Sequence, residues 1–170
     1  IYWVSSSIFW INFKTTSYDD HGHGTHVAGT AVGTGGSAGI YKGVAPQAKL
    51  VGVKVLNSWG SGTFSDVIAG IEWTIQNKEL YNISVISMSL GANRNGDGTS
   101  PVEIAATTAV ENGINFVVAA GNSGPRKNSV GIPASAKKVI TVGAIDDNKN
   151  IASFSSRGPT EDNRTKPEVS

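Results

Sequence analysis

Short apolar, β-branched runs alternate with segments of helical periodicity along most of the chain beyond Asp20. This alternation is typical of βαβ units arranged around a parallel sheet. The middle runs are almost continuously apolar, as expected for strands that are covered on both faces. The expected strands are Ile8 to Phe13, Lys49 to Leu56, Ser84 to Leu90, Ile114 to Ala120 and Lys138 to Ala144.

Three helices are expected among these strands. A Thr-x-x-Asp capping box at residues 63–66 precedes an apolar repeat at helical spacing. A Ser-x-x-Glu box at residues 100–103, with Pro101 at the first helical position, begins a second helix that ends at residues 112–113. The third expected helix runs from His23 through Thr34.

Composition excludes several classes of function. The 170 residues suffice for one domain, and we expect residues 1–170 to form a single one. Fourteen Lys and Arg residues against thirteen Asp and Glu residues include no basic block, so we expect no nucleic-acid partner. The chain has no cysteine, and no apolar run approaches the roughly 20 residues that span a bilayer.

All three histidines of the chain lie between His21 and His26. One interpretation is a general base at a helix N-terminus, where a neutral imidazole can accept a proton near pH 7. A second is a metal site, because His-x-His-x-x-His is similar to the ligand spacing of metallohydrolases. A third is a structural histidine near a turn. The histidines alone leave these alternatives open.

Six further segments occur in a characteristic order. They are HGTHVAG at 23–29, GVAP at 43–46, GSG at 60–62, SMSLG at 87–91, AAGNSGP at 119–125 and SFSSRGPT at 153–160. Together they closely resemble the subtilisin-like serine protease family, also called subtilases or peptidase family S8. The resemblance implies an α/β fold of three layers, with a mostly parallel sheet and helices on both faces, incomplete here at both ends.

The resemblance assigns two catalytic roles in this chain. His23 matches the family's catalytic base, which takes the proton of the serine nucleophile and returns it to the leaving amine. Asn122 matches the side-chain amide of the oxyanion hole, a donor for the charge that develops on the carbonyl oxygen. His26 is then a structural residue one helical turn further on.

The resemblance also assigns substrate-binding segments. Two backbone segments would hold the peptide as an added antiparallel strand. Small, uncharged residues would form a roomy pocket for a large apolar or aromatic side chain before the scissile bond. The strand-binding residues are Gly60, Ser61, Gly62, Ser89, Leu90 and Gly91, and the pocket residues are Ala119, Ala120, Gly121 and Gly131. The bond between Ile132 and Pro133 falls where the family often has a cis peptide.

The catalytic Asp and Ser are expected to lie outside the chain. In subtilisin the Asp precedes the His by about 32 residues and the Ser follows it by about 157, offsets that leave residues 1–170 when counted from His23. Asp19 and Asp20 are too close to His23 to be the family's Asp, and Ser100 lacks the Met-Ala that follows the nucleophile. We therefore expect an internal fragment of the catalytic domain that is inactive alone.

Two alternatives belong to other functional classes. One is a metal-dependent hydrolase built on His21, His23 and His26 with Asp19 or Asp20. The other is a pseudoprotease that binds peptides without cleaving them.

The resemblance also suggests what accompanies the catalytic domain. It implies a protein or peptide substrate, a possible propeptide and secretion, and it requires no cofactor for the chemistry. A structural calcium is possible, but no metal ligand is assigned, and a solvated turn is favoured for Asp146, Asp147 and Asn148.

Overall fold

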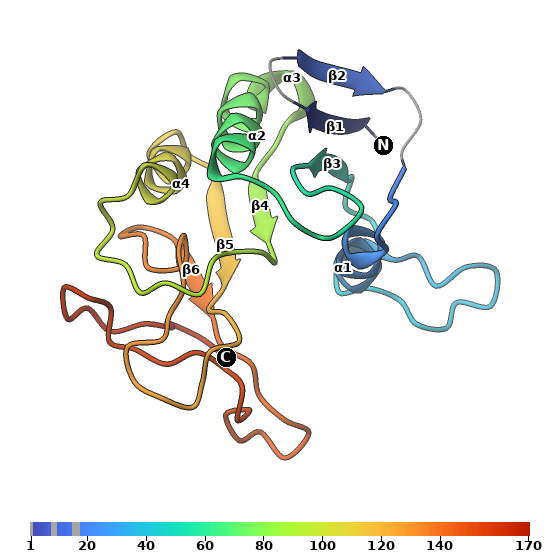
Figure 1. Cartoon of the computed structure of the whole chain (residues 1–170). Helices are drawn as coiled ribbons and strands as arrows, with labels where there is room; N and C mark the ends of the chain where they lie inside the picture. Colours follow the sequence, from blue (N-terminus) through green and yellow to red (C-terminus); the bar gives the residue numbers. More distant parts are fainter. Residues whose placement is uncertain (1, 8–9, 15–17) are drawn as a thin grey trace. The chain divides into compact units, whose positions relative to one another are not determined.

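The computed structural model describes residues 2–7, 10–14 and 18–170 (Figure 1). The chain divides into two compact units, residues 1–70 and residues 71–170. No helix in the described part of the chain has both the length and the apolar character that a bilayer crossing requires.

The first unit contains a three-stranded sheet in which β1 (Tyr2–Ser7) is the middle strand. β1 pairs antiparallel with β2 (Trp10–Lys14) and parallel with β3 (Val51–Lys54). The connection between β2 and β3 contains α1 (His23–Val32). β1 and β3 thus form a parallel pair whose connection contains an antiparallel strand and a helix.

α2 (Phe64–Gln76) begins in the first unit, and a glycine brings it close to β3. A Cβ at Gly70 would lie 2.7 Å from Val55 Cγ1 and 3.1 Å from Val53 Cγ1. A side chain there would therefore force the helix away from the strand. Glycine weakens a helix interior by roughly 1 kcal/mol relative to alanine, so its presence here is explained by close packing.

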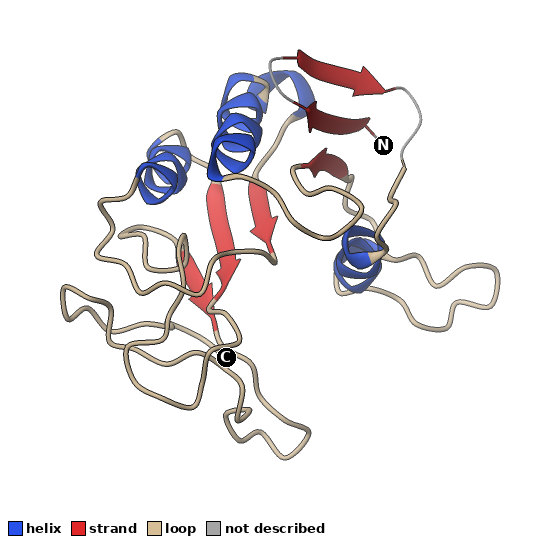
Figure 2. Ribbon diagram, in the orientation of Figure 1, coloured by secondary structure: helices blue, strands red, loops and turns tan. Residues whose placement is uncertain are grey.

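The second unit is built on a parallel sheet in the order β4-β5-β6 (Figure 2). β4 (Val85–Met88) pairs with β5 (Asn115–Ala119), which pairs with β6 (Ile140–Val142). α4 (Pro101–Glu111) lies in the connection from β4 to β5. Ile114, Phe116 and Val118 are each 1% exposed and are buried with the apolar residues of α4, Val102, Ala106 and Ala109. Residues 143–170 form loops and turns with isolated bridges.

Most of the expected elements are present, with shorter bounds. The helices expected at 64–75, at 101–112 and from His23 are confirmed as α2, α4 and α1. The first expected strand overlaps β2, and its residues 8–9 lie outside the described residues. The sequence patterns did not predict β1 or the one-turn helix α3 (Lys78–Tyr81), because a Ser triplet interrupts β1 and α3 is too short for periodicity.

A buried carboxylate joins the start of α4 to two loops. Glu103 is 1% exposed. Its carboxylate accepts hydrogen bonds from Gly98 N at 3.0 Å, Ser100 N at 3.1 Å, Ser100 Oγ at 2.6 Å and Ser135 Oγ at 2.6 Å. The predicted capping box is therefore confirmed. It also ties the helix to a residue 32 positions further along the chain.

We predict that Glu103→Leu lowers the free energy of unfolding by about 3 kcal/mol or more, because it leaves buried donors without an acceptor. Urea unfolding followed by circular dichroism measures the change. Glu111→Ala in the same helix is the control, because its ion pair with Lys138 joins side chains that are about half exposed, and such pairs contribute under about 1 kcal/mol. Equal losses in the two variants would contradict the prediction.

Candidate active site

The segment before His23 is held by one carboxylate. Asp19 accepts the backbone N–H of His21 at 3.0 Å, of Gly22 at 2.8 Å and of Thr25 at 2.7 Å, and the hydroxyl of Thr25 at 2.8 Å. The N-cap position of α1 is Gly22, with φ of 94° and no side-chain cap of its own. Asp19 therefore satisfies the free N–H groups that an N-cap side chain would otherwise bind. These hydrogen bonds, that of Gly22 first, hold the pKa of Asp19 well below its usual range.

A second contact ties the same segment to the end of β3. The Lys54 ammonium lies 2.8 Å from Asp20 Oδ1, donates to the carbonyl of Leu56, and sits 5.6 Å from the centroid of the Tyr18 ring. The hydrogen bond from Lys54 lowers the pKa of Asp20. The residues on both sides of Asp19 are thus fixed to the sheet of the first unit.

His23 is the first residue of α1, and its side chain is exposed. Its ring lies 6.4 Å from that of His21 in an edge-on arrangement, and its ring nitrogens form no hydrogen bond to another described residue. Among the described residues no group of three or more His, Asp or Glu side chains is placed to hold a metal ion. The arrangement therefore does not support the alternative of a metallohydrolase built on the three histidines.

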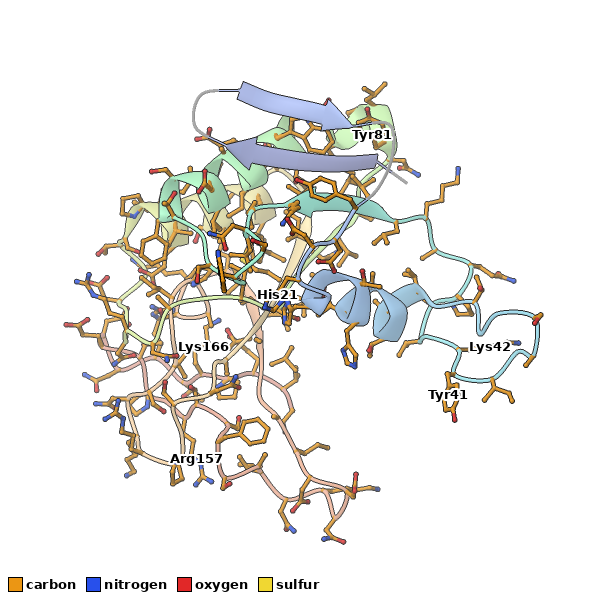
Figure 3. All side chains as sticks on the ribbon, turned by 45° about the vertical axis from the view of Figure 1, so that its right-hand side comes forward. His21, Tyr41, Lys42, Tyr81, Arg157 and Lys166 are labelled. Atoms are coloured by element: carbon orange, nitrogen blue, oxygen red, sulfur yellow. The ribbon has the colours of Figure 1, made fainter. Side chains whose placement is uncertain are left out.

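The predicted substrate segment at residues 60–62 is a tight loop in contact with His21. Asn57 Oδ1 accepts the N–H groups of Trp59 at 2.9 Å and Ser61 at 3.2 Å. Gly60 has φ of 70°, and a Cβ there would lie 2.8 Å from His21 Nε2. His21, labelled in Figure 3, thus packs directly on the backbone of this loop. Ser61 and Gly62 are exposed.

Asn122 lies just beyond the carboxyl end of β5, on a loop whose backbone is bound on both sides. Ser156 N donates to Gly121 O at 2.9 Å, and Ser156 Oγ accepts Ser123 N at 3.0 Å. Gly121 has φ of 105°, a conformation that favours glycine. The Asn122 side chain is exposed and forms no hydrogen bond to another described residue.

The structure brings the predicted pocket residues together. Gly131 N donates to Ala120 O at 3.0 Å, and a Cβ at Gly131 would lie 2.5 Å from Ala92 O. Ala92 and Ile132 exchange backbone hydrogen bonds at 2.9 and 3.2 Å, which places Gly91 against the carbonyl of Ile132. Ala119, Ser89 and Gly91 are exposed, Leu90 is half-buried, and Ala120 is 1% exposed. The Ile132–Pro133 peptide is cis.

Asp146 binds the backbone of the turn that follows it. Asp146 Oδ1 already accepts the N–H groups of Asn148 and Asn150, each at 2.9 Å, within a turn. Asp146 thus closes an exposed turn with its own carboxylate.

The sequence patterns did not predict the residues that bind the backbone beside His23 and Asn122. Lys54 gave no signal beyond a charge at the end of an apolar run. Ser156 belongs to the SFSSRGPT segment, which carried the resemblance without a role for its serines. Asp19 entered only as a possible ligand or triad residue, although an acidic residue ahead of a helix start is a recognisable capping signal.

Comparisons with known proteins agree on one family. A family model described as the subtilase family matches residues 10–170. Serine protease AprX of Bacillus subtilis (strain 168) is 47% identical over 173 residues, covering 94% of this chain and 39% of the relative. Subtilisin DY of Bacillus licheniformis is 46% identical over 150 residues, covering 87% of this chain and 52% of the relative. The chain thus spans about half or less of these curated relatives.

Solved structures confirm the fold class. Sphericase matches with a TM-score of 0.79 and 36% identity, over 92% of this chain and 51% of that protein. The S41 psychrophilic protease matches with a TM-score of 0.74 and 37% identity, over 88% of this chain and 50% of that protein. The predicted three-layer α/β architecture with a largely parallel sheet is therefore confirmed.

We predict that Asp19→Asn destabilises the start of α1 in a pH-dependent way. Because the pKa of Asp19 is lowered in the folded state, its contribution is complete above its ordinary value of about 4 and is lost as the pH falls below it. The difference in melting temperature between the wild type and Asp19→Asn should be constant near neutral pH and shrink below about pH 4. The exposed turn residue Asp147, changed to Asn, is the control. A difference that stays unchanged down to pH 2 would contradict this account.

Proposed function

This chain belongs to the subtilase family, and we propose that residues 1–170 form part of the catalytic domain of a serine endopeptidase. The observation that carries the proposal is the match over residues 10–170, which includes the segments around His23 and Asn122. The enzyme would hydrolyse peptide bonds with an Asp-His-Ser triad and an oxyanion hole.

Under this proposal His23 is the general base. It takes the proton from the serine hydroxyl as that oxygen attacks the scissile carbonyl, and it gives the proton to the leaving amine. The exposed imidazole supports this role, because both ring nitrogens are free of other described residues. In a triad one nitrogen binds the Asp carboxylate and the other faces the serine. Asp19 holds the backbone beside His23 and leaves the ring unengaged.

Asn122 would donate its side-chain N–H to the oxygen of the tetrahedral intermediate. The Asn122 amide is exposed and forms no hydrogen bond within the described part of the chain. This supports the role, since a donor already bound to a protein acceptor would have to break that bond during the reaction. The segments at 60–62 and 89–91 would each pair their backbone with an extended substrate.

Secretion and a propeptide stay expectations from the family resemblance.

The catalytic Asp and Ser are proposed to lie outside residues 1–170. No Asp-Thr-Gly or Asp-Ser-Gly occurs in the sequence, and no Gly-Thr-Ser-Met-Ala. The chain's span of 39% and 52% of its relatives leaves room for both residues elsewhere in the whole protein.

We predict that the isolated 170-residue chain shows no triad-dependent hydrolysis of a chromogenic peptide, whereas the full-length protein cleaves it. In the full-length protein, His23→Ala should lower kcat by about 10⁶, the size known for this residue in subtilisin itself. His26→Ala, one turn along α1, is the control and should retain most activity.

Two outcomes would contradict this assignment. Cleavage by the isolated chain that disappears in His23→Ala would show that the chain holds a complete catalytic set. A full-length protein that binds peptide substrates but neither cleaves them nor reacts with a serine-directed phosphonate would indicate a pseudoprotease.

We predict a preference for large apolar side chains before the scissile bond. The walls at Ala119, Ala120, Gly121 and Gly131 are small and uncharged, so a charged side chain would lose water without gaining a partner. The value of kcat/KM for a peptide with Phe at this position should exceed that for Glu by at least about tenfold. The same Phe-to-Glu change after the scissile bond is the control. Equal discrimination at both positions would contradict the assignment of the pocket.

A further inference from the structure

We infer that Ser156 is a positioning residue that fixes the loop carrying Asn122 for its part in the reaction. The inference rests on the proposed function, because it assumes that Asn122 is the side-chain donor of the oxyanion hole. Ser156 itself does not reach the substrate, since its side chain is buried.

Ser156 binds the residues on both sides of Asn122. Its backbone N–H donates to Gly121 O at 2.9 Å, and its hydroxyl oxygen accepts Ser123 N at 3.0 Å. One residue thus fixes the peptide groups before and after Asn122. Gly124 N donates to Phe154 O at 2.9 Å, which continues the pairing one residue further.

Ser156 is itself held in place by burial and by the hydrogen bonds of the next residue. It is 1% exposed. The residue that follows it, Arg157, labelled in Figure 3, donates its N–H to Ser129 Oγ at 2.9 Å and accepts Ser129 N at 2.9 Å. A Cβ at Gly121 would lie 3.0 Å from Ser156 Oγ, so the two backbones approach closely. Ser156 is therefore a fixed point against which the loop is held.

Unlike the peptide groups on either side of it, the Asn122 side chain forms no hydrogen bond to Ser156. Its side chain is exposed and has no hydrogen-bond partner among the described residues. The position and direction of its Cα–Cβ bond are fixed by the backbone of residues 121–123, which restricts the directions that its amide can take. An oxyanion-hole donor stabilises the transition state only when it is already oriented toward the developing charge. The hydroxyl of Ser156 contributes to that orientation by fixing the backbone at Ser123.

The test uses Ser156→Ala in the full-length protein. This change removes the acceptor for Ser123 N and keeps the backbone bond to Gly121. We expect kcat to fall roughly tenfold with KM nearly unchanged, a part of the roughly 10²–10³ that a whole oxyanion-hole donor contributes. Ser156→Cys, which keeps the shape but is a weak acceptor, should give a smaller fall. Rates are normalised to active sites titrated with a phosphonate, so that a change in folded fraction does not enter.

Ser155→Ala is the matched control. Ser155 is also 1% exposed, and its hydroxyl also accepts a backbone N–H, that of Ala144 at 3.0 Å. It therefore loses the same kind of buried hydrogen bond without touching residues 121–123. We expect a comparable loss of thermal stability and an unchanged kcat.

A double-mutant cycle with Asn122→Ala separates positioning from general structure. If Ser156 acts through Asn122, Ser156→Ala should have almost no effect on kcat once Asn122 is alanine. An equal fall in both backgrounds, an unchanged kcat in Ser156→Ala, or an equal fall in Ser155→Ala would each overturn the inference while leaving the role of Asn122 intact. If Asn122→Ala alone retains full kcat, the proposed oxyanion role fails, and the inference fails with it.

Discussion

Parallel pairing of β4, β5 and β6 is the constraint on which the second unit depends. In a parallel sheet the carboxyl ends of neighbouring strands lie at the same edge. β4 ends at Met88 and β5 at Ala119, so the segments that follow them, 89–91 and 120–122, leave the sheet side by side. The exchange of hydrogen bonds between Ala92 and Ile132 and the bond from Gly131 to Ala120 then close the loops on one another. The residues predicted to form the pocket meet because of strand direction rather than any interaction between their side chains.

Buried polar groups hold the other loops of the second unit in place, because its three-stranded sheet is too small to cover them. Glu103 joins the start of α4 to the loop at Ser135, and the Lys166 ammonium donates to Val139 O at 2.7 Å while it pairs with Glu168 at 2.6 Å. Burial lowers the pKa of Lys166, so this charge is held at a cost that its partners offset. Each group is stabilising only because its hydrogen bonds are satisfied. The long loops after β6 are therefore ordered by specific partners more than by apolar area.

The sequence predicted the parts of this structure that local patterns encode. The capping boxes at Thr63 and Ser100 and the apolar runs of β4 and β5 are periodic or positional signals, and they gave elements close to those observed. β1 was missed because serines interrupt its alternation. Motifs indicated His23 and Asn122. Asp19, which binds the backbone beside His23, is a local partner, but the residue that holds the Asn122 loop is distant in sequence: Ser156 is 33 residues from Ser123. Contacts of this kind follow from the fold and have no local pattern.

His23 and Asn122 share one physical arrangement, although they lie in different units. Each has an exposed side chain without a hydrogen bond to another described residue, on a backbone that a neighbour binds at more than one point. That neighbour is Asp19 for the helix start of His23 and Ser156 for the loop of Asn122. A side chain that hydrogen-bonds to its own protein is fixed, but it is also occupied. Fixing the backbone instead restricts the side chain's direction while its donor or acceptor stays available for a reacting group. It also explains how Asp19, four residues before His23, can bind the backbone and the Thr25 hydroxyl of this segment and leave the His23 ring without a hydrogen bond from its carboxylate.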